Sequence, residues 1–361
     1  MNATMRRVVI GTAAVSMALS MAACGKAGSA GGDGDNKTIG LLLPENKTTR
    51  YETFDRPLIK AKIKSLCKDC DVAYNNANQD TETQKKQFDA LITKGVKVII
   101  LDPVDATATR SWVDAAAKKG VKVVAYDRLA EGDISAYVSY DNEKIGQLQG
   151  EGVLNALGDE AKDSRVVMIN GSPTDPNAAL FKAGAHKVLD GKVKKVVYEQ
   201  DIPDWSPDEA NRKMAAAITS LGKEGFDAVY SANDGMAGGI TTALKSSGIK
   251  DVPVGGQDSE LAGLQRILSG SQTFTIYKGI KPEAETTAEI AVKLLKGEKI
   301  DSVAPETVAS KSKKGIPTKL YDATIVTKGN IKDTILKDEV YTAGQICTAD
   351  FAKACKAAGI K

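Results

Sequence analysis

Short apolar runs alternate with longer amphipathic stretches along the chain from Lys37 onward. The runs are four to six residues long and rich in Val, Ile, Ala and Tyr, a composition typical of buried β-strands. We predict strands over Thr38–Leu43, Val72–Asn75, Val98–Leu101, Val121–Tyr126, Val166–Ile169, Val193–Tyr198, Ala228–Ser231, Val252–Gly255 and Thr273–Tyr277.

Helical periodicity fills the segments between these strands. Thr81–Thr93 places Phe88 and Leu91 on one helical face. A second helical segment, Ala106–Lys119, ends at Gly120, a residue favoured at helix C-termini. Strands and helices that alternate in this way specify an α/β fold with parallel sheets covered on both faces. Ligands of such open sheets bind beyond the carboxyl ends of the strands.

The N-terminus carries an export signal. Arg6 and Arg7 precede an apolar run, residues 8–23, that is too short to span a bilayer as a stable helix, and we interpret residues 1–23 as a signal peptide. The small residues just before Cys24 resemble the lipobox of bacterial lipoproteins, which implies cleavage before Cys24 and a lipid on its sulfur. A secretory signal followed by a chance cysteine is the alternative. Residues 24–36 have the composition of a flexible tether.

Length and composition limit the domain count and the partners. Without signal and tether, about 325 residues remain, more than one hydrophobic core usually holds, so two lobes are expected. The chain is 42% hydrophobic and 26% charged, as in an ordinary globular protein, and a net charge of +3 is too small to indicate nucleic-acid binding. No other segment is apolar over eighteen residues, so we expect only the lipid to hold the protein at the membrane. We also expect a monomer.

Four further cysteines form two close pairs, Cys67/Cys70 and Cys347/Cys355. Because export leads to an oxidising environment, two local disulfides are the preferred interpretation. A redox motif or half of a zinc site is the alternative for the first pair. The only histidine, His186, lies far away in sequence. A lone histidine makes Ser-His-Asp, Cys-His and common zinc-hydrolase sites improbable, so we predict neither a metal nor a cofactor.

Polar and aromatic residues gather directly after the predicted strands. Carboxylates accept hydrogen bonds from sugar hydroxyls, Arg, Lys and Asn donate them, and aromatic rings cover the apolar ring face of a sugar. A monosaccharide is therefore the predicted ligand. The groups that follow the strands are Arg50-Tyr51, Asp127-Arg128, Asp141-Asn142, Asp175-Pro176-Asn177, Asp204-Trp205, Asn233-Asp234, Gln257-Asp258 and Lys278.

Several of these segments together resemble the D-xylose-binding proteins of sugar ABC importers. They are Ala125-Tyr126-Asp127-Arg128, Asp141-Asn142-Glu143, Gly171-Ser172-Pro173 through Phe181, Asn233-Asp234, Gly256-Gln257-Asp258 and Tyr277-Lys278, and the similarity runs from about Ile39 to Asp338. The resemblance implies a type I periplasmic-binding-protein fold, two Rossmann-like lobes joined by a three-segment hinge. It assigns 37–141 and 279–320 to the N-terminal lobe and 142–278 and 321–361 to the C-terminal lobe.

The resemblance also implies the sugar contacts: Arg50, Asp127, Arg128, Asp175, Asn177, Trp205, Asn233, Asp258 and Lys278. Tyr51 departs from the family, which carries a tryptophan beside the arginine, and we expect its smaller ring to stack on the sugar as well. Each position also has a structural interpretation. Asp127-Arg128 could be a solvated pair, Trp205 a core residue, Asn233 a helix cap and Lys278 a surface residue.

Three function classes share this fold. We predict an extracytoplasmic receptor that binds a monosaccharide, D-xylose first, between the lobes and delivers it to an ABC permease by hinge closure. Multi-sugar receptors for uptake or chemosensing share several of the motifs and are the alternative. A DNA-binding regulator would begin with a helix-turn-helix instead of an export signal. An extracellular glycoside-acting enzyme would need two carboxylates set across the scissile bond, and no sequence feature selects that geometry.

Overall fold

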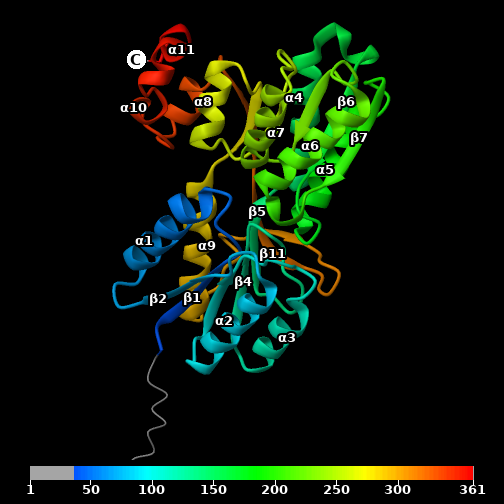
Figure 1. The fold of residues 1–361 in the computed structure, drawn as a ribbon. Helices are drawn as coiled ribbons and strands as arrows, with labels where there is room; N and C mark the ends of the chain where they lie inside the picture. The colour runs from blue at the N-terminus through cyan, green and yellow to red at the C-terminus, as the bar shows by residue number, and fades with distance from the viewer. Residues whose placement is uncertain (1–35, 361) are drawn as a thin grey trace, which may run out of the picture. The chain divides into compact units, whose positions relative to one another are not determined.

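A seven-stranded and a three-stranded sheet organise the residues that the structure, a computed structural model, describes: 36–360 (Figure 1). The predicted signal peptide, Cys24 and most of the predicted tether lie outside the described residues. The elements around the larger sheet are called the large-sheet half below, and those around the smaller sheet the small-sheet half.

The large-sheet half contains a seven-stranded sheet in the order β10-β11-β5-β4-β3-β1-β2. All neighbouring strands are parallel except β10 and β11. The strands are β1 (Thr38–Leu43), β2 (Asp71–Asn76), β3 (Val98–Leu101), β4 (Lys122–Tyr126), β5 (Ala136–Tyr140), β10 (Glu306–Val308) and β11 (Ile316–Tyr321).

Helices cover both faces of this sheet because its strands are apolar on both sides. In β1, Ile39 and Leu41 pack into one core cluster with α1 (Arg56–Leu66) and α9 (Ile280–Leu295). Leu42 points to the opposite face and packs into a second cluster. That second face is covered by α2 (Thr81–Thr93) and α3 (Arg110–Lys118), and a short helical segment, η1 (Tyr51–Asp55), leads into α1.

The small-sheet half has a parallel sheet in the order β7-β6-β8, with its own core. A separate antiparallel pair, β9 and β12, lies beside it. The elements of this half are α4 (Asn142–Leu157), η2 (Gly158–Asp163), β6 (Arg165–Asn170), α5 (Pro176–Leu189), β7 (Lys195–Asp201), η3 (Pro203–Trp205), α6 (Pro207–Leu221), β8 (Ala228–Ser231), α7 (Asp234–Ser246), α8 (Leu261–Ser269), β9 (Phe274–Lys278) and β12 (Ala323–Thr327).

The chain passes between the two halves three times: from β5 into α4, from β9 into α9, and from β11 into β12. Each passage is short, and the last one leaves only Asp322 between two strands of different sheets. The three passages therefore bring the carboxyl ends of both parallel sheets toward each other (Figure 1).

Three predicted elements differ from the structure by more than one residue at an end. The strand predicted over Val193–Tyr198 runs from Lys195 to Asp201. Val252–Gly255 is no strand, because Val254 makes only a single bridge to Val229. The helix predicted from Ala106 begins at Arg110, since the Asp105 carboxylate accepts from the backbone amides of Thr107 and Ala108 and holds a turn there.

The C-terminal residues form a small helical module on α8. It contains η4 (Lys332–Leu336), α10 (Ala343–Ile346), η5 (Ala349–Phe351) and α11 (Ala352–Ala357). In the structure Cys347 is joined to Cys355, and Cys67 to Cys70. Both pairs follow the expected local connectivity.

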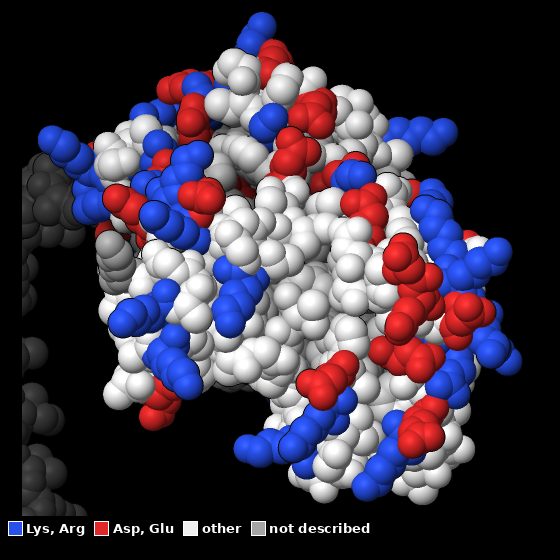
Figure 2. Space-filling view, turned by 90° about the horizontal axis from the view of Figure 1, so that it is seen from above, with Lys and Arg blue, Asp and Glu red and all other residues white. Residues whose placement is uncertain are grey.

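Charges of both signs are mixed over the face shown in Figure 2, and uncharged residues occupy its centre. This distribution agrees with the small net charge of +3. Among residues 36–360, no helix is both long and apolar enough to cross a membrane.

Candidate functional site

A cavity opens where the two halves meet, and all ten residues predicted to contact a ligand line it. Arg50, Tyr51, Asp127 and Arg128 come from the large-sheet half. The small-sheet half supplies the other six, which are Asp175, Asn177, Trp205, Asn233, Asp258 and Lys278. Each of the ten side chains is at least nine-tenths buried. Segments up to 228 positions apart thus meet at one site, as the rule for open parallel sheets predicts.

Arg50 is held by carboxylates on the side away from the cavity. Its Nε lies 3.1 Å from Asp55 Oδ2, and its Nη2 lies 2.6 Å from both Asp55 Oδ1 and Glu283 Oε2. Only Nη1 turns to a residue that lines the cavity, donating to Asp127 Oδ1 at 3.1 Å. The paired carboxylates therefore fix the planar guanidinium in one orientation.

Three carboxylates, those of Asp55, Asp127 and Glu283, share the single positive charge of Arg50. Burial, opposed by Arg50 and reinforced by Asp127 and Asp55, raises the pKa of Glu283 to about 8. Glu283 Oε1 is buried and has no hydrogen-bond partner. A proton on Glu283 at neutral pH relieves the repulsion among three anions that share one cation.

Asp127 turns its backbone sharply at the end of β4. Its φ of 54° lies in the left-handed region, which Asp tolerates better than most residues. Its carbonyl oxygen accepts from the hydroxyls of Tyr137 and Ser139 and from Asn177 Nδ2, at 3.0, 2.6 and 3.1 Å. These three bonds hold the strained residue so that its carboxylate faces the cavity.

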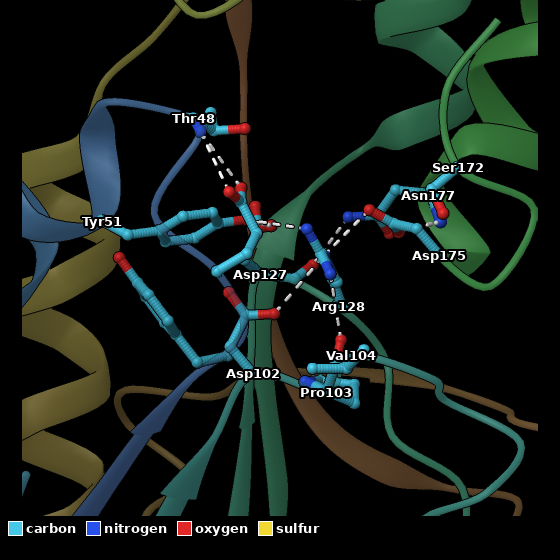
Figure 3. A network of polar contacts seen from close by, with 12 residues as sticks. Thr48, Tyr51, Asp102, Pro103, Val104, Asp127, Arg128, Ser172, Asp175 and Asn177 are labelled. Carbon is cyan, nitrogen blue, oxygen red and sulfur yellow. Dashed lines mark hydrogen bonds and ion pairs between the residues drawn. The ribbon is translucent and has the colours of Figure 1, made fainter. Parts of the chain in front are cut away.

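Arg128 connects the two halves (Figure 3). Its Nε lies 2.8 Å from Asp175 Oδ2 of the small-sheet half and 3.5 Å from Asp102 Oδ1 of its own half. Its Nη2 donates to the Tyr51 hydroxyl at 3.2 Å, and its Nη1 to the carbonyl of Pro103 at 3.1 Å. Burial raises the pKa of Asp102 well above its usual range, although Arg128 opposes this.

Asp175 has two structural roles beside its place in the cavity wall. It is the N-cap of α5, where its carboxylate accepts from the backbone amide of Asn177 at 2.8 Å. Its other oxygen accepts from the indole nitrogen of Trp205 at 3.2 Å. Trp205 has a positive φ of 52°, and its ring lies against Gly171, where a Cβ would come within 2.1 Å of the ring. Glycine at 171 thus leaves the room that the indole needs.

Lys278 and Asp258 form a buried ion pair of 3.0 Å in the cavity wall. The lysine nitrogen also lies 5.3 Å from the centre of the Tyr140 ring and 5.8 Å from that of Phe181. Nearby, Asn233 caps α7 by accepting from the Met236 amide at 2.9 Å. Helix capping and exposure to the cavity therefore coexist at Asn233.

Three residues that line the cavity were not among the predicted sugar contacts: Thr48, Phe181 and Gln257. Phe181 follows Asn177 by one helical turn on α5, and Gln257 directly precedes Asp258, so both carried a positional signal. Thr48 carried none. It is placed by the buried carboxylate of Glu45, which accepts from the backbone amides of Lys47 and Thr48. In the part of the chain from 36 to 360, no cluster of His, Cys, Asp and Glu has metal-binding geometry.

Two α/β halves that enclose a buried polar cavity at their strand ends define a two-lobed binding protein. The periplasmic binding protein domain matches residues 39–299. The D-xylose-binding periplasmic protein of Escherichia coli (strain K12) is 37% identical over 315 residues, 85% of this chain and 92% of that protein. The chain therefore belongs to the periplasmic binding protein family, in which it is similar to the D-xylose-binding periplasmic proteins.

Two further relatives show how wide the similarity is. The multiple sugar-binding periplasmic receptor of Rhizobium radiobacter is 28% identical and covers 86% of this chain and 93% of its own. The crystal structure of an ABC transporter solute-binding protein from Clostridium phytofermentans with bound β-D-glucose superposes with a TM-score of 0.76. Its identity is 28%, over 86% of this chain and 99% of that one.

Proposed function

We propose that this chain is the receptor of an ABC importer that binds a monosaccharide, D-xylose before other sugars, and delivers it to a membrane permease. One observation carries the proposal. Residues chosen for sugar contact from seven separate stretches of the sequence line a single buried cavity. The similarity to D-xylose-binding periplasmic proteins at 36–37% identity supports the choice of sugar.

The cavity wall suits a polyhydroxylated ring. Asp127 and Asp175 offer acceptors, Arg128 and Lys278 offer donors, and the Trp205 indole offers an aromatic face. A buried polar group left without a partner costs about 1–3 kcal/mol. The site therefore rejects a sugar that lacks one of the expected hydroxyls more strongly than a sugar with an additional exposed group.

A multi-sugar receptor is the second candidate, and Tyr51 favours it. The tyrosine hydroxyl accepts from Arg128 and donates to Asp127 at 3.3 Å, so part of its polar capacity is used within the protein. A smaller ring than tryptophan leaves room beside it, which suits a hexose with a hydroxymethyl group.

Binding requires the halves to separate and close again. The free volume in the cavity is about 20 Å³, whereas a single water needs roughly 10–15 Å³. A sugar therefore enters only when residues 37–141 with 279–320 and residues 142–278 with 321–361 move apart as two lobes. The three passages between the halves form the hinge, and the ligand pulls the equilibrium toward the closed form.

We place the receptor outside the cytoplasm as a monomer, anchored to the cell membrane by a lipid on Cys24. Replacement of Cys24 by alanine is expected to move the protein from the membrane fraction into the medium or the periplasm. A Cys24→Ala variant that stays with the membrane contradicts the anchor.

The chain acts as a receptor and not as an enzyme. An aryl glycoside incubated with the full chain is expected to remain intact. Turnover that disappears in an Asp127→Asn or Asp258→Asn variant contradicts this part of the proposal and favours a glycoside-acting enzyme.

Intrinsic fluorescence provides a direct test because the chain has two tryptophans. Trp112 packs in the core of the large-sheet half, and Trp205 lines the cavity. A Trp112→Phe variant keeps only the indole at the site. Titration of this variant with D-xylose is expected to change its fluorescence saturably at micromolar sugar, and calorimetry is expected to give the same affinity for the unmodified chain.

A sugar panel separates the two candidates. D-Glucose, D-galactose, L-arabinose, D-ribose and xylitol are titrated under the same conditions, with Trp205→Ala as the site control. Xylose binding that is lost in Trp205→Ala supports the first candidate, and comparable binding of glucose supports the second. Absence of heat and of fluorescence change with every sugar contradicts the monosaccharide proposal.

A further inference from the structure

The C-terminal residues 331–360, called the C-terminal module below, add a contact between the two halves beside the three chain passages. The module packs its apolar side chains on α8 of the small-sheet half, and the Cys347–Cys355 disulfide lies within this cluster. Among the described residues, Phe54 is the only member of the cluster that comes from the large-sheet half.

Tyr341 makes this contact with its ring. The ring meets the Phe54 ring edge-on, with 5.4 Å between centroids and 71° between planes. Tyr341 also belongs to the cluster that packs on α8, which begins at Leu261. Tyr341 is buried, so the aromatic pair is shielded from water. One side chain therefore bridges the two halves.

Phe54 belongs to the segment that positions two site residues. It lies in η1, which begins with Tyr51 and directly follows Arg50. The same segment ends with Asp55, which holds the Arg50 guanidinium through two nitrogens. A contact that fixes Phe54 therefore also restricts the orientation of Arg50 and Tyr51 in the cavity wall.

A second contact between the halves lies beside the first. The Thr49 backbone amide donates to Glu260 Oε1 at 3.2 Å, over 211 positions of sequence. Glu260 directly precedes α8, and its own amide donates to Asp234 Oδ2 at 2.9 Å. The module therefore covers the helix whose N-terminal end already meets the Arg50 segment.

We propose that the C-terminal module is a clasp in which Tyr341 is a positioning residue: it docks on Phe54 and fixes the Tyr51–Asp55 segment so that the halves stay closed over the site. The inference rests on the proposed binding function, which it deepens by explaining how a bound ligand is retained. The Cys347–Cys355 disulfide closes a short loop of the module that begins six positions after Tyr341.

Dissociation kinetics test the clasp because it acts only on the closed form. The full chain and its Phe54→Ala, Tyr341→Ala and doubly substituted variants are loaded with the sugar of highest affinity. Release is followed by stopped-flow fluorescence of Trp205. Each single variant is expected to release sugar about three- to tenfold faster, the range for a lost aromatic pair, with an unchanged association rate.

Two further variants separate a clasp from general destabilisation. Tyr341→Phe keeps the ring that meets Phe54, so its effect should be smaller than that of Tyr341→Ala. Phe351→Ala removes another aromatic ring of the same cluster, one that forms no ring pair with Phe54 within residues 36–360, and should lower the melting temperature without faster release. The double variant should be no faster than the faster single variant.

Unchanged release from Phe54→Ala, or equally fast release from Phe351→Ala, overturns the clasp while the binding function stands. If no sugar binds the unmodified chain, the proposed function fails, and X-ray scattering of the sugar-free chain decides about the clasp. Phe54→Ala is then expected to increase the radius of gyration relative to the unmodified chain, and an identical radius overturns the proposal.

Discussion

The two walls of the cavity are organised by different physical means. On the large-sheet half, Arg50 and Arg128 are embedded among buried carboxylates, including Asp55, Asp102 and Glu283. On the small-sheet half, Asp175 and Asn233 stand at helix N-termini and accept backbone amides of the following turn. One wall is a network of desolvated charges, and the other combines helix caps with the single ion pair of Lys278 and Asp258.

The difference predicts how each wall responds to substitution. A buried charge network fails when one partner is removed, because the remaining charges stay desolvated and unpaired. A helix cap can be replaced by another capping residue at small cost. Substitutions in the charge network of the large-sheet wall should therefore lower the free energy of unfolding strongly. Conservative exchanges of the capping residues in the small-sheet wall should change it little.

The largest effect is expected at Arg50. Arg50→Met leaves three carboxylates without their shared cation and should lower the free energy of unfolding by about 3–5 kcal/mol, with loss of sugar binding. Urea unfolding and calorimetry measure both effects. Arg110→Met is the matched control, because the exposed pair Arg110–Asp114 spans 4.0 Å and should change stability by less than about 0.5 kcal/mol. An equal loss of unfolding free energy in Arg50→Met and Arg110→Met would contradict the contrast between a buried and an exposed arginine.

A smaller effect is expected at Asp175, which is both a helix cap and a charged partner of Arg128. Asp175→Asn keeps a capping side chain on α5 but loses the charge 2.8 Å from Arg128, at a cost of about 1.5–3 kcal/mol. Asp175→Ala should cost about 1 kcal/mol more, because the cap is lost as well. Urea unfolding of both variants measures the difference, and equal stability of the two would show that the cap contributes nothing.

The pH dependence of stability tests the carboxylate excess around Arg50. The pKa of Glu283 is raised from 4.5 to about 8, so the native chain holds a proton that the unfolded chain releases between these values. The stability that the Glu283 proton contributes is therefore fully present below about pH 4.5. This contribution falls as the pH rises to 8, by at most about 1.4 kcal/mol per pH unit.

Glu283→Gln should flatten this decline, as measured by melting temperatures between pH 5 and 9. Part of the decline should remain, since burial also raises the pKa of Glu260 to about 8 and that of Asp234 to about 7. A profile identical to that of the unmodified chain would mean that Glu283 carries no proton at neutral pH.

The smallest effect is expected at Asn233. Asn233→Ala removes the cap of α7 and should cost about 1 kcal/mol, whereas Asn233→Asp keeps the cap and should cost a few tenths at most. Urea unfolding measures stability, and calorimetry shows whether the amide also serves the sugar. Weaker binding in Asn233→Asp at unchanged stability would separate the two roles.

Local patterns were sufficient for much of the fold. The limits of β1, β3, β8 and α2 agree with the predicted ones, because apolar runs and helical faces are encoded by adjacent residues. The short strands β10 to β12 were not predicted. They are short and largely half-exposed, and β12 is paired with β9, which lies more than 40 positions earlier in the chain. Pairing with a distant partner leaves no local signal.

The site divides in the same way. The rule that ligands bind at strand ends pointed to the polar groups that follow the strands, since position after a strand is a local property. The resemblance to D-xylose-binding proteins then narrowed these groups to the ten residues that line the cavity. The supports behind them were not found. Glu283 lies 233 positions from the Arg50 that it holds, and Glu260 lies 211 positions from Thr49.

By itself, the sequence determined an α/β protein with polar groups at its strand ends and predicted an export signal, because periodicity and short motifs are local. The tertiary structure alone decided which charges pair, which carboxylates share one cation and that Tyr341 meets Phe54. The physical reason is that electrostatic and aromatic contacts depend on distance in space, and chain folding sets that distance independently of separation in sequence.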